Sequence, residues 1–454
     1  MSKSHMPASK TIVPPAEVLA TIGRHMLADG EHLVVDLKRS HGPYLRDEAT
    51  GREYLDFYSY FASQPVGHNH PKLRTPAFCK RIGEVALYKP ANADVYTTYM
   101  AEFVATFARV AKPADMPYLF FIDGGALAVE NALKTAFDWK VRKNLAAGRG
   151  ERGSQIIHFQ EAFHGRSGYT LSLTNTADPR KHLYFPKFAW PRIINPKLRF
   201  PVTEATLAET VALERQAIAQ IKEAVRANPH DIAGLIIEPI QGEGGDNHFR
   251  PEFFQELRRL AGEAEFLFMV DEVQTGIGTT GKMWGIEHMG VQPDVIAFGK
   301  KAQICGIIAG PRLDEVPDNV FHVSSRINST WGGNLVDMVR GQRFLEIIEE
   351  DGLVENAAAM GRLLLEGMAQ IAGQSDLIAN VRGRGMFVAF DLPSPRTRDL
   401  FRGLLWENGL IALKSGQQSV RFRPMLDLSP AAVEEALGIV EDTLYDARSD
   451  GGQL

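Results

Sequence analysis

The chain has 454 residues, more than one hydrophobic core usually holds, so we expect a large domain with a smaller one beside it. Apolar residues make up 44% and charged residues 23% of the chain, as in ordinary globular proteins. The formal net charge of -5 argues against a nucleic-acid or membrane-surface role, which normally requires a basic excess, and no apolar run has the roughly 18 residues of a membrane span.

The cysteines and the first residues indicate a reducing compartment. Cys79 and Cys305 lie far apart in the sequence, so they form neither a disulfide framework nor a CxxC metal pattern. The first 15 residues lack the apolar core of a secretory signal. We therefore expect a cytoplasmic protein.

The N-terminal part predicts short elements. A weak helical pattern covers residues 18–27, and two short strands are predicted at 32–37 and 51–57. A polar turn with His68 and His70 follows, but no third ligand lies close by, so no metal site is predicted.

Continuous apolar runs begin after residue 76. Such runs, without polar alternation, are typical of strands buried on both faces of a parallel sheet. They lie at 118–122, 155–159, 234–237, 266–270, 295–298 and 306–309. Amphipathic helical stretches lie between several of them, for example Ala126, Val129, Leu133 and Ala136, or Val211, Ile218, Ile221 and Val225. The pattern predicts an α/β architecture with a long sheet.

Helix dominates after Asn334. Strands are predicted only at 386–391 and 419–423, with helices near 396–408 and 430–447. We therefore predict a large domain over residues 76–340 and a smaller α+β domain formed by 1–75 together with 341–454.

Two lysines follow the apolar run 295–298, after a glycine. An ammonium group at the end of a buried strand loses its water, so Lys300 or Lys301 must be neutral, paired with an anion, or bound covalently to a carbonyl compound as an imine. The alternative for the pair alone is two exposed loop lysines.

Asp271 follows another apolar run, one crossover upstream of Lys300. Ligands of open α/β sheets bind outside the carboxyl ends of the strands, where both residues are predicted to lie. An aspartate there can keep a pyridine nitrogen protonated; alternatively it caps a helix.

Glycines follow two further strand ends. Gly125, after the run 118–122, precedes a helix beginning near Ala126, where backbone amides attract a phosphate; the alternative is an ordinary tight turn. Glu238 and Glu243 belong to a glycine-rich loop after the run 234–237, which lines a cleft or forms an exposed turn.

Aromatic and arginine side chains complete the set. Phe163 can stack on a ring and Arg166 can bind a carboxylate, although they could equally be a core residue and a surface charge. Arg421 is a second carboxylate-binding candidate. Strand alternation places Arg423 on the same face, so the pattern does not choose between the two.

These residues carry a resemblance. The segment 267–276 around Asp271 and the segment 294–300 ending in Lys300 resemble the signature of class III (ω-amino acid) pyridoxal-phosphate aminotransferases. Supporting stretches lie at 54–57, 67–71, 163–166, 238–243 and 330–334, so the likeness spans roughly residues 35–430. Stretches 163–176, 299–306 and 328–334 look most like the members that act on the ε-amino group of L-lysine.

The resemblance implies a fold type I transferase, with a mainly parallel sheet of the seven-stranded type between helices, that binds pyridoxal 5'-phosphate (PLP) as a homodimer. It makes Lys300 the imine lysine and Lys301 its bystander neighbour. The implied cofactor-binding residues are Gly125 and Ala126 at the phosphate, Phe163 and Val273 on the ring faces, Asp271 at the ring nitrogen, Gln274 at the ring hydroxyl, Glu238, and Thr330 from the other subunit. Gly125 stands where many members have a serine or threonine.

The resemblance also implies the reaction, a transfer of the lysine ε-amino group to 2-oxoglutarate. Arg166 is expected to bind the lysine carboxylate, and Arg421 to bind 2-oxoglutarate, with Glu243 covering Arg421 when lysine is present; Asn328 and Gln274 are further substrate-binding expectations. The alternatives are another ω-aminotransferase (ornithine, acetylornithine or 4-aminobutyrate), a class III aminomutase, or a non-enzymatic α/β binding protein.

Overall fold

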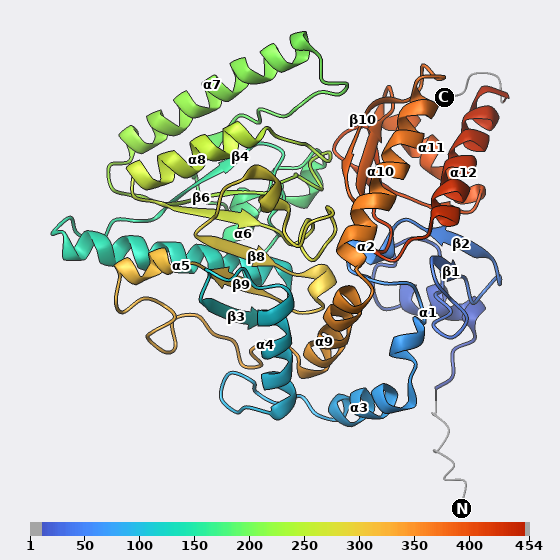
Figure 1. The fold of residues 1–454 in the computed structure, drawn as a ribbon, viewed down its shortest axis with the longest axis horizontal. Helices are drawn as coiled ribbons and strands as arrows, with labels where there is room; N and C mark the ends of the chain where they lie inside the picture. Colours follow the sequence, from blue (N-terminus) through green and yellow to red (C-terminus); the bar gives the residue numbers. More distant parts are fainter. Residues whose placement is uncertain (1–10, 450–454) are drawn as a thin grey trace, which may run out of the picture.

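The computed structural model describes residues 11–449, so most of the first 15 residues lie outside it. A large sheet between helices forms one side of the molecule, and a smaller unit built from the N- and C-terminal segments forms the other (Figure 1). Within the described range, no helix is long and apolar enough to cross a membrane.

The large sheet has seven strands, which confirms the predicted architecture. Their spatial order is β3 (Tyr118–Ile122), β9 (Cys305–Ala309), β8 (Val295–Phe298), β7 (Leu267–Asp271), β6 (Ile232–Ile237), β4 (Gln155–Phe159) and β5 (Arg192–Ile193). Neighbours from β8 to β5 run parallel, whereas β9 is antiparallel to both β8 and β3. All six apolar runs are strands of this sheet.

Both faces of the sheet are covered, as apolar runs without alternation require. Successive strand residues enter different cores: Ile156 packs with α5 (Gly125–Ala146), whereas Ile157 lies in the core with α7 (Glu204–Ala227) and α8 (Pro251–Glu263). In Figure 1, α5 lies on one side of the sheet and α7 and α8 lie on the other. Because β7 and β8 are parallel neighbours, their carboxyl ends bring Asp271 and Lys300 to the same edge.

The smaller unit joins the two ends of the chain. One sheet has the order β1 (Tyr44–Arg46), β2 (Glu53–Asp56), β12 (Leu410–Ile411), and the other β10 (Ala379–Arg384), β11 (Phe387–Asp391), β14 (Ser419–Phe422), β13 (Leu413–Ser415). The predicted strand at 32–37 is wrong: Val35 makes only an isolated bridge, and Leu37 is 76% exposed. The strand that pairs with β2 begins instead at Tyr44.

The remaining helices connect or cover these sheets. The α-helices are α1 (Val18–Gly23), α2 (Ser59–Ala62), α3 (Pro76–Ala86), α4 (Thr98–Val110), α6 (Gly168–Leu173), α9 (Leu335–Glu350), α10 (Leu353–Ala372), α11 (Pro395–Glu407) and α12 (Pro430–Ser449). Short 3-10 helices are η1 (Pro15–Glu17), η2 (Pro71–Leu73), η3 (Pro179–Lys181), η4 (Gly285–Met289), η5 (Lys300–Ala302) and η6 (Pro311–Glu315).

Candidate active site

Lys300 lies where β8 runs into η5 and lines a cavity of about 360 Å³. Its backbone φ is +49°, a left-handed conformation that costs a non-glycine residue roughly 1–3 kcal/mol. Burial, followed by the positive charge of Arg421, lowers the pKa of Lys300 to about 8. The strand end therefore holds an amine that faces a cavity and loses its proton more easily than an ordinary lysine.

Lys301 points elsewhere. Its Nζ is buried and donates a hydrogen bond to the carbonyl oxygen of Ala62 at 3.0 Å. Burial, helped by the charge of Arg423, lowers the pKa of Lys301 to about 7. The alternative of two exposed loop lysines is wrong, because Lys301 is 2% exposed and Lys300 is partly buried.

Most of the predicted site residues line the same cavity as Lys300. They are Gly125, Ala126, Phe163, Arg166, Glu238, Asp271, Val273 and Gln274. Their contributing segments follow β3, β4, β6, β7 and β8, so the cavity lies outside the carboxyl ends of the parallel strands. Arg166 is exposed, whereas Asp271 and Glu238 are buried.

Asp271 is held by two neighbours. Its Oδ1 accepts from the backbone N–H of Val273 at 3.0 Å, and its Oδ2 lies 2.8 Å from Nδ1 of His164. Burial opposes a charge on His164, but the hydrogen bond and charge of Asp271 prevail and raise the pKa of His164. His164 was not among the predicted site residues, although its position directly after Phe163 and before Gly165 was a signal that could have indicated it.

The helix α5 begins beside this cavity. Gly124, its N-cap, has φ +96° and makes no side-chain capping bond, so the first amides of a 22-residue helix are available to an anion. A Cβ added at Gly125 would stand 3.1 Å from Val273 Cγ1, so it is the absence of a side chain at Gly125 that lets the backbone lie close to Val273. The helix start can therefore hold a phosphate through backbone N–H groups alone.

Glu238 joins two of the loops that form the site. Its Oε1 accepts from the N–H of Phe163 at 3.0 Å and its Oε2 from the N–H of Gly242 at 2.9 Å. Burial raises the pKa of Glu238 to about 7. Its carboxyl group thus holds the backbone of Phe163 next to the loop that carries Glu243.

The structure separates the two arginines that alternation could not. Arg421 Nη2 lies 3.2 Å from Glu243 Oε2, and its Nη1 lies 3.5 Å from Gln274 Oε1. Arg423 is buried behind it and pairs with Asp246 at 2.7 Å. Among the described residues, the buried Nε of Arg421 has no hydrogen-bond partner. Arg421 is therefore the arginine next to the cavity, and Glu243 covers it.

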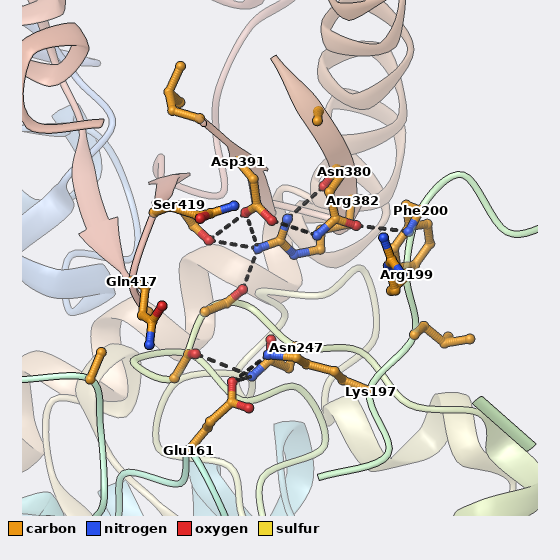
Figure 2. Close-up of a pocket in the computed structure, with 18 of the residues that line it drawn as sticks. Glu161, Lys197, Arg199, Phe200, Asn247, Asn380, Arg382, Asp391, Gln417 and Ser419 are labelled. Atoms are coloured by element: carbon orange, nitrogen blue, oxygen red, sulfur yellow. Dashed lines mark hydrogen bonds and ion pairs between the residues drawn. The ribbon is translucent and has the colours of Figure 1, made fainter. Parts of the chain in front are cut away.

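The small unit fixes the backbone of the Glu243 loop. Arg382 donates to the carbonyl oxygens of Gly245 and, at 3.0 Å, of Asp246. Figure 2 shows Arg382 beside Asp391 and Ser419, in a second cavity of about 680 Å³ between the small unit's four-stranded sheet and loops of the large unit. This second cavity lies behind the loop and contains none of the residues predicted for catalysis.

Four predicted residues do not line the Lys300 cavity. Arg421 and Glu243 are connected to it through the 3.5 Å contact of Arg421 with Gln274, whereas Asn328 and Thr330 lie on a separate loop. Both are exposed, and neither lines the Lys300 cavity. The loop that carries them ends at Asn334, whose backbone N–H donates to Asp123 at 3.0 Å.

The comparison with known proteins identifies the family. The family model described as aminotransferase class-III matches residues 26–444. The chain belongs to the class III aminotransferases. It is 50% identical over 433 residues to the L-lysine-epsilon aminotransferase of Mycobacterium tuberculosis (strain H37Rv), covering 95% of this chain and 96% of that relative. It is 48% identical over 424 residues to the enzyme of the same name from Streptomyces clavuligerus, covering 93% and 92%.

A solved structure supports the same assignment. The lysine aminotransferase from M. tuberculosis, solved in its internal aldimine form, superimposes with a TM-score of 0.93 at 49% identity, covering 96% of this chain and all of that one. Class III aminotransferases depend on PLP, and the cavity of this aminotransferase fits that group. It combines a lysine of lowered pKa, a paired buried carboxylate and a helix start without a side-chain cap.

Proposed function

We propose that this class III aminotransferase transfers the ε-amino group of L-lysine to 2-oxoglutarate. The products are glutamate and 2-aminoadipate 6-semialdehyde, which cyclises to piperideine-6-carboxylate. Two relatives at about half identity over nearly the whole chain carry the lysine-epsilon aminotransferase name. The single observation that carries the proposal is the cover that Glu243 places over Arg421.

The Glu243–Arg421 ion pair accounts for a difference in charge placement between the two substrates. Lysine reacts at a carbon far from its carboxylate, whereas 2-oxoglutarate carries a carboxylate next to the reacting carbon. An arginine beside the reacting carbon must therefore be masked for lysine and free for 2-oxoglutarate. Glu243 masks Arg421 in this structure, and the exposed Arg166 at the cavity mouth takes the distant lysine carboxylate.

The residues around Lys300 take defined roles toward the cofactor. PLP, when bound, supplies an electron sink that lets a proton leave the carbon bearing the amine. Lys300 Nζ is the point of covalent attachment and, once free, the base that moves this proton. Asp271, supported by His164, keeps a ring nitrogen protonated. The other proposed contacts are Phe163 and Val273 on the ring faces, Gln274 at the ring hydroxyl, Glu238 behind Phe163, and Gly125 and Ala126 at the phosphate.

A homodimer completes the proposed site. Thr330 and Asn328 are exposed here, and beside them Trp331 leaves 43% of its surface uncovered. We propose that Thr330 binds the phosphate and Asn328 the substrate in the neighbouring subunit's site. Replacing Thr330 with alanine should then weaken cofactor binding while sedimentation still shows a dimer. A monomeric wild type would contradict this part of the proposal.

The amine donor is tested with a panel. Lysine, ornithine, N-acetylornithine and 4-aminobutyrate are each assayed with 2-oxoglutarate, and lysine should give the highest kcat/KM. A higher value for another amine would replace lysine as the donor. Conversion of lysine without any acceptor would instead indicate an aminomutase.

The cover is tested by measuring the two half-reactions separately. Glu243→Ala exposes Arg421 permanently, so the half-reaction with lysine should slow much more than the half-reaction with glutamate. Single-turnover absorbance changes of the cofactor report each half-reaction. Equal losses in both would contradict the proposed role of Glu243.

A further inference from the structure

Glu243 lies between two cations, of which the proposed function uses only one. Its Oε2 faces Arg421, and its Oε1 forms an ion pair with Nζ of Lys181 at the end of η3. The Arg421 side chain is 4% exposed, whereas that of Lys181 is 28% exposed. One partner is therefore inside the site and the other faces its rim.

The backbone around Glu243 is fixed, so its side chain is the part that can move. The carbonyl oxygen of Glu243 accepts from the N–H of Gly416 at 2.9 Å, and the preceding N–H, of Gly242, donates to Glu238. A Cβ at Gly244 would stand 2.0 Å from the carbonyl oxygen of Glu161, which leaves no room for a shifted chain. Uncovering Arg421 therefore requires rotation of the Glu243 carboxylate.

Rotation away from Arg421 separates opposite charges at the edge of a buried site. Leaving a partly buried carboxylate without a partner is costly, because it loses its counter-charge without regaining full hydration. Lys181 already contacts the other carboxylate oxygen and lies on the exposed side. It can keep its ion pair with Glu243 while the bond to Arg421 breaks.

We propose that Lys181 is a positioning residue that determines the balance between the two substrates by holding Glu243 when Arg421 is uncovered. This inference rests on the proposed function. With Arg421 covered, Glu243 has two cationic partners. With Arg421 free, Lys181 is the one that remains of the two ion-pair partners that Glu243 has among residues 11–449, so loss of Lys181 destabilises the uncovered state more than the covered one. Lys181 thus favours the substrate with a carboxylate beside its reacting carbon.

The test is Lys181→Met, measured in the two half-reactions. The second-order rate with 2-oxoglutarate or glutamate should fall by about two- to fivefold, the range for a partly exposed ion pair, while the rate with lysine stays unchanged. Lys181→Arg should restore the lost rate, since it keeps the charge. An equal change in both half-reactions, or no change in either, would overturn the inference.

Two controls separate positioning from general attraction of anions. Arg180 lies in the same turn but pairs with Asp178, so Arg180→Met removes an equal charge without touching Glu243 and should leave both half-reactions unchanged. In a Glu243→Gln background, Lys181→Met should have no further effect. A loss with Arg180→Met equal to that with Lys181→Met, or a full Lys181 effect without the Glu243 charge, would refute positioning.

The same measurements distinguish failure of this inference from failure of the proposed function. If Glu243→Ala slows the lysine half-reaction selectively but Lys181→Met does not discriminate, only the role of Lys181 is wrong. If Glu243→Ala slows both half-reactions equally, the cover itself is wrong and the inference falls with it.

Discussion

Nδ1 of His164 lies 2.8 Å from Oδ2 of Asp271, and both side chains are buried at the wall of the Lys300 cavity. A buried carboxylate without a charged partner favours its protonated form. The hydrogen bond and charge of Asp271 raise the pKa of His164, which favours an imidazolium beside the carboxylate. This counter-charge stabilises a carboxylate that can hold a proton on a ring nitrogen.

Replacing His164 with leucine should therefore impair catalysis without removing a group that touches the substrate. Loss of the charged partner of a buried carboxylate costs about 1–3 kcal/mol, so kcat should fall by roughly five- to 150-fold. The loss should be largest below the raised pKa of His164, where the wild-type imidazole carries its charge, and should shrink at higher pH as His164 loses its proton. A pH profile of kcat checks this, and a uniform loss across the profile would contradict the pairing role.

Substitutions of the two adjacent lysines, Lys300 and Lys301, should have different kinds of effect. Lys300→Ala should abolish the absorbance of covalently attached cofactor and turnover with it. Lys301→Met should retain both but reduce the free energy of unfolding by about 1–3 kcal/mol, because the Ala62 carbonyl loses its buried donor. Absorbance spectra and denaturant unfolding check the pair. Turnover that survives in Lys300→Ala would refute the assignment of Lys300.

Covalent attachment of the cofactor should depend on pH through Lys300. Only the neutral amine is a nucleophile, and the pKa of Lys300 is lowered to about 8, so the rate of cofactor uptake by the apoenzyme should rise with pH and level off above about 8. Arg421→Gln removes a charge that lowers the pKa of Lys300, so the midpoint, the pH at which the uptake rate reaches half its maximum, should move to a higher value. A midpoint that moves down, or stays fixed, would contradict the electrostatic coupling.

Substitution of Arg421 should mainly reduce activity, whereas substitution of Arg423 should mainly reduce stability. Arg423→Met leaves Asp246 buried without its closest partner and should destabilise the fold by about 3–5 kcal/mol. Arg421→Met should slow the 2-oxoglutarate half-reaction by at least about thirtyfold, with the lysine half-reaction largely retained. Unfolding curves and single-turnover rates distinguish the two. Equal losses of unfolding free energy in Arg421→Met and Arg423→Met would contradict these separate roles.

The large sheet was predictable because its strands are buried on both faces. The strand β8 is entirely apolar and β7 is apolar up to its last residue, Asp271, so Asp271 and the segment after β8 emerge at a shared sheet edge. The small unit was harder to predict from the sequence. The strand β10 contains Asn380, Arg382 and Gly383, which carry no strand pattern, and its place depends on pairing with β11 and on contacts to a loop of the other domain.

The predicted site depended on similar local signals. Lys300 and Asp271 stand at strand ends, and Gly125 stands at a helix start, so short segments suffice to indicate them. Strand alternation did not choose between Arg421 and Arg423, and the family resemblance implied Arg421. The physical reason is the pairing of Arg423 with Asp246, which is far away in the sequence. The contact of Lys181 with Glu243 likewise joins two loops whose approach no local pattern encodes.

The central claim is that the ε-nitrogen of lysine reaches 2-oxoglutarate through the site at Lys300. The most direct measurement uses lysine labelled with ¹⁵N at the ε-position, incubated with the enzyme and 2-oxoglutarate, with the products separated and analysed by mass spectrometry. We expect labelled glutamate and an unlabelled cyclic product that has kept the α-nitrogen. Unlabelled glutamate, or label retained in the lysine-derived product, would contradict it.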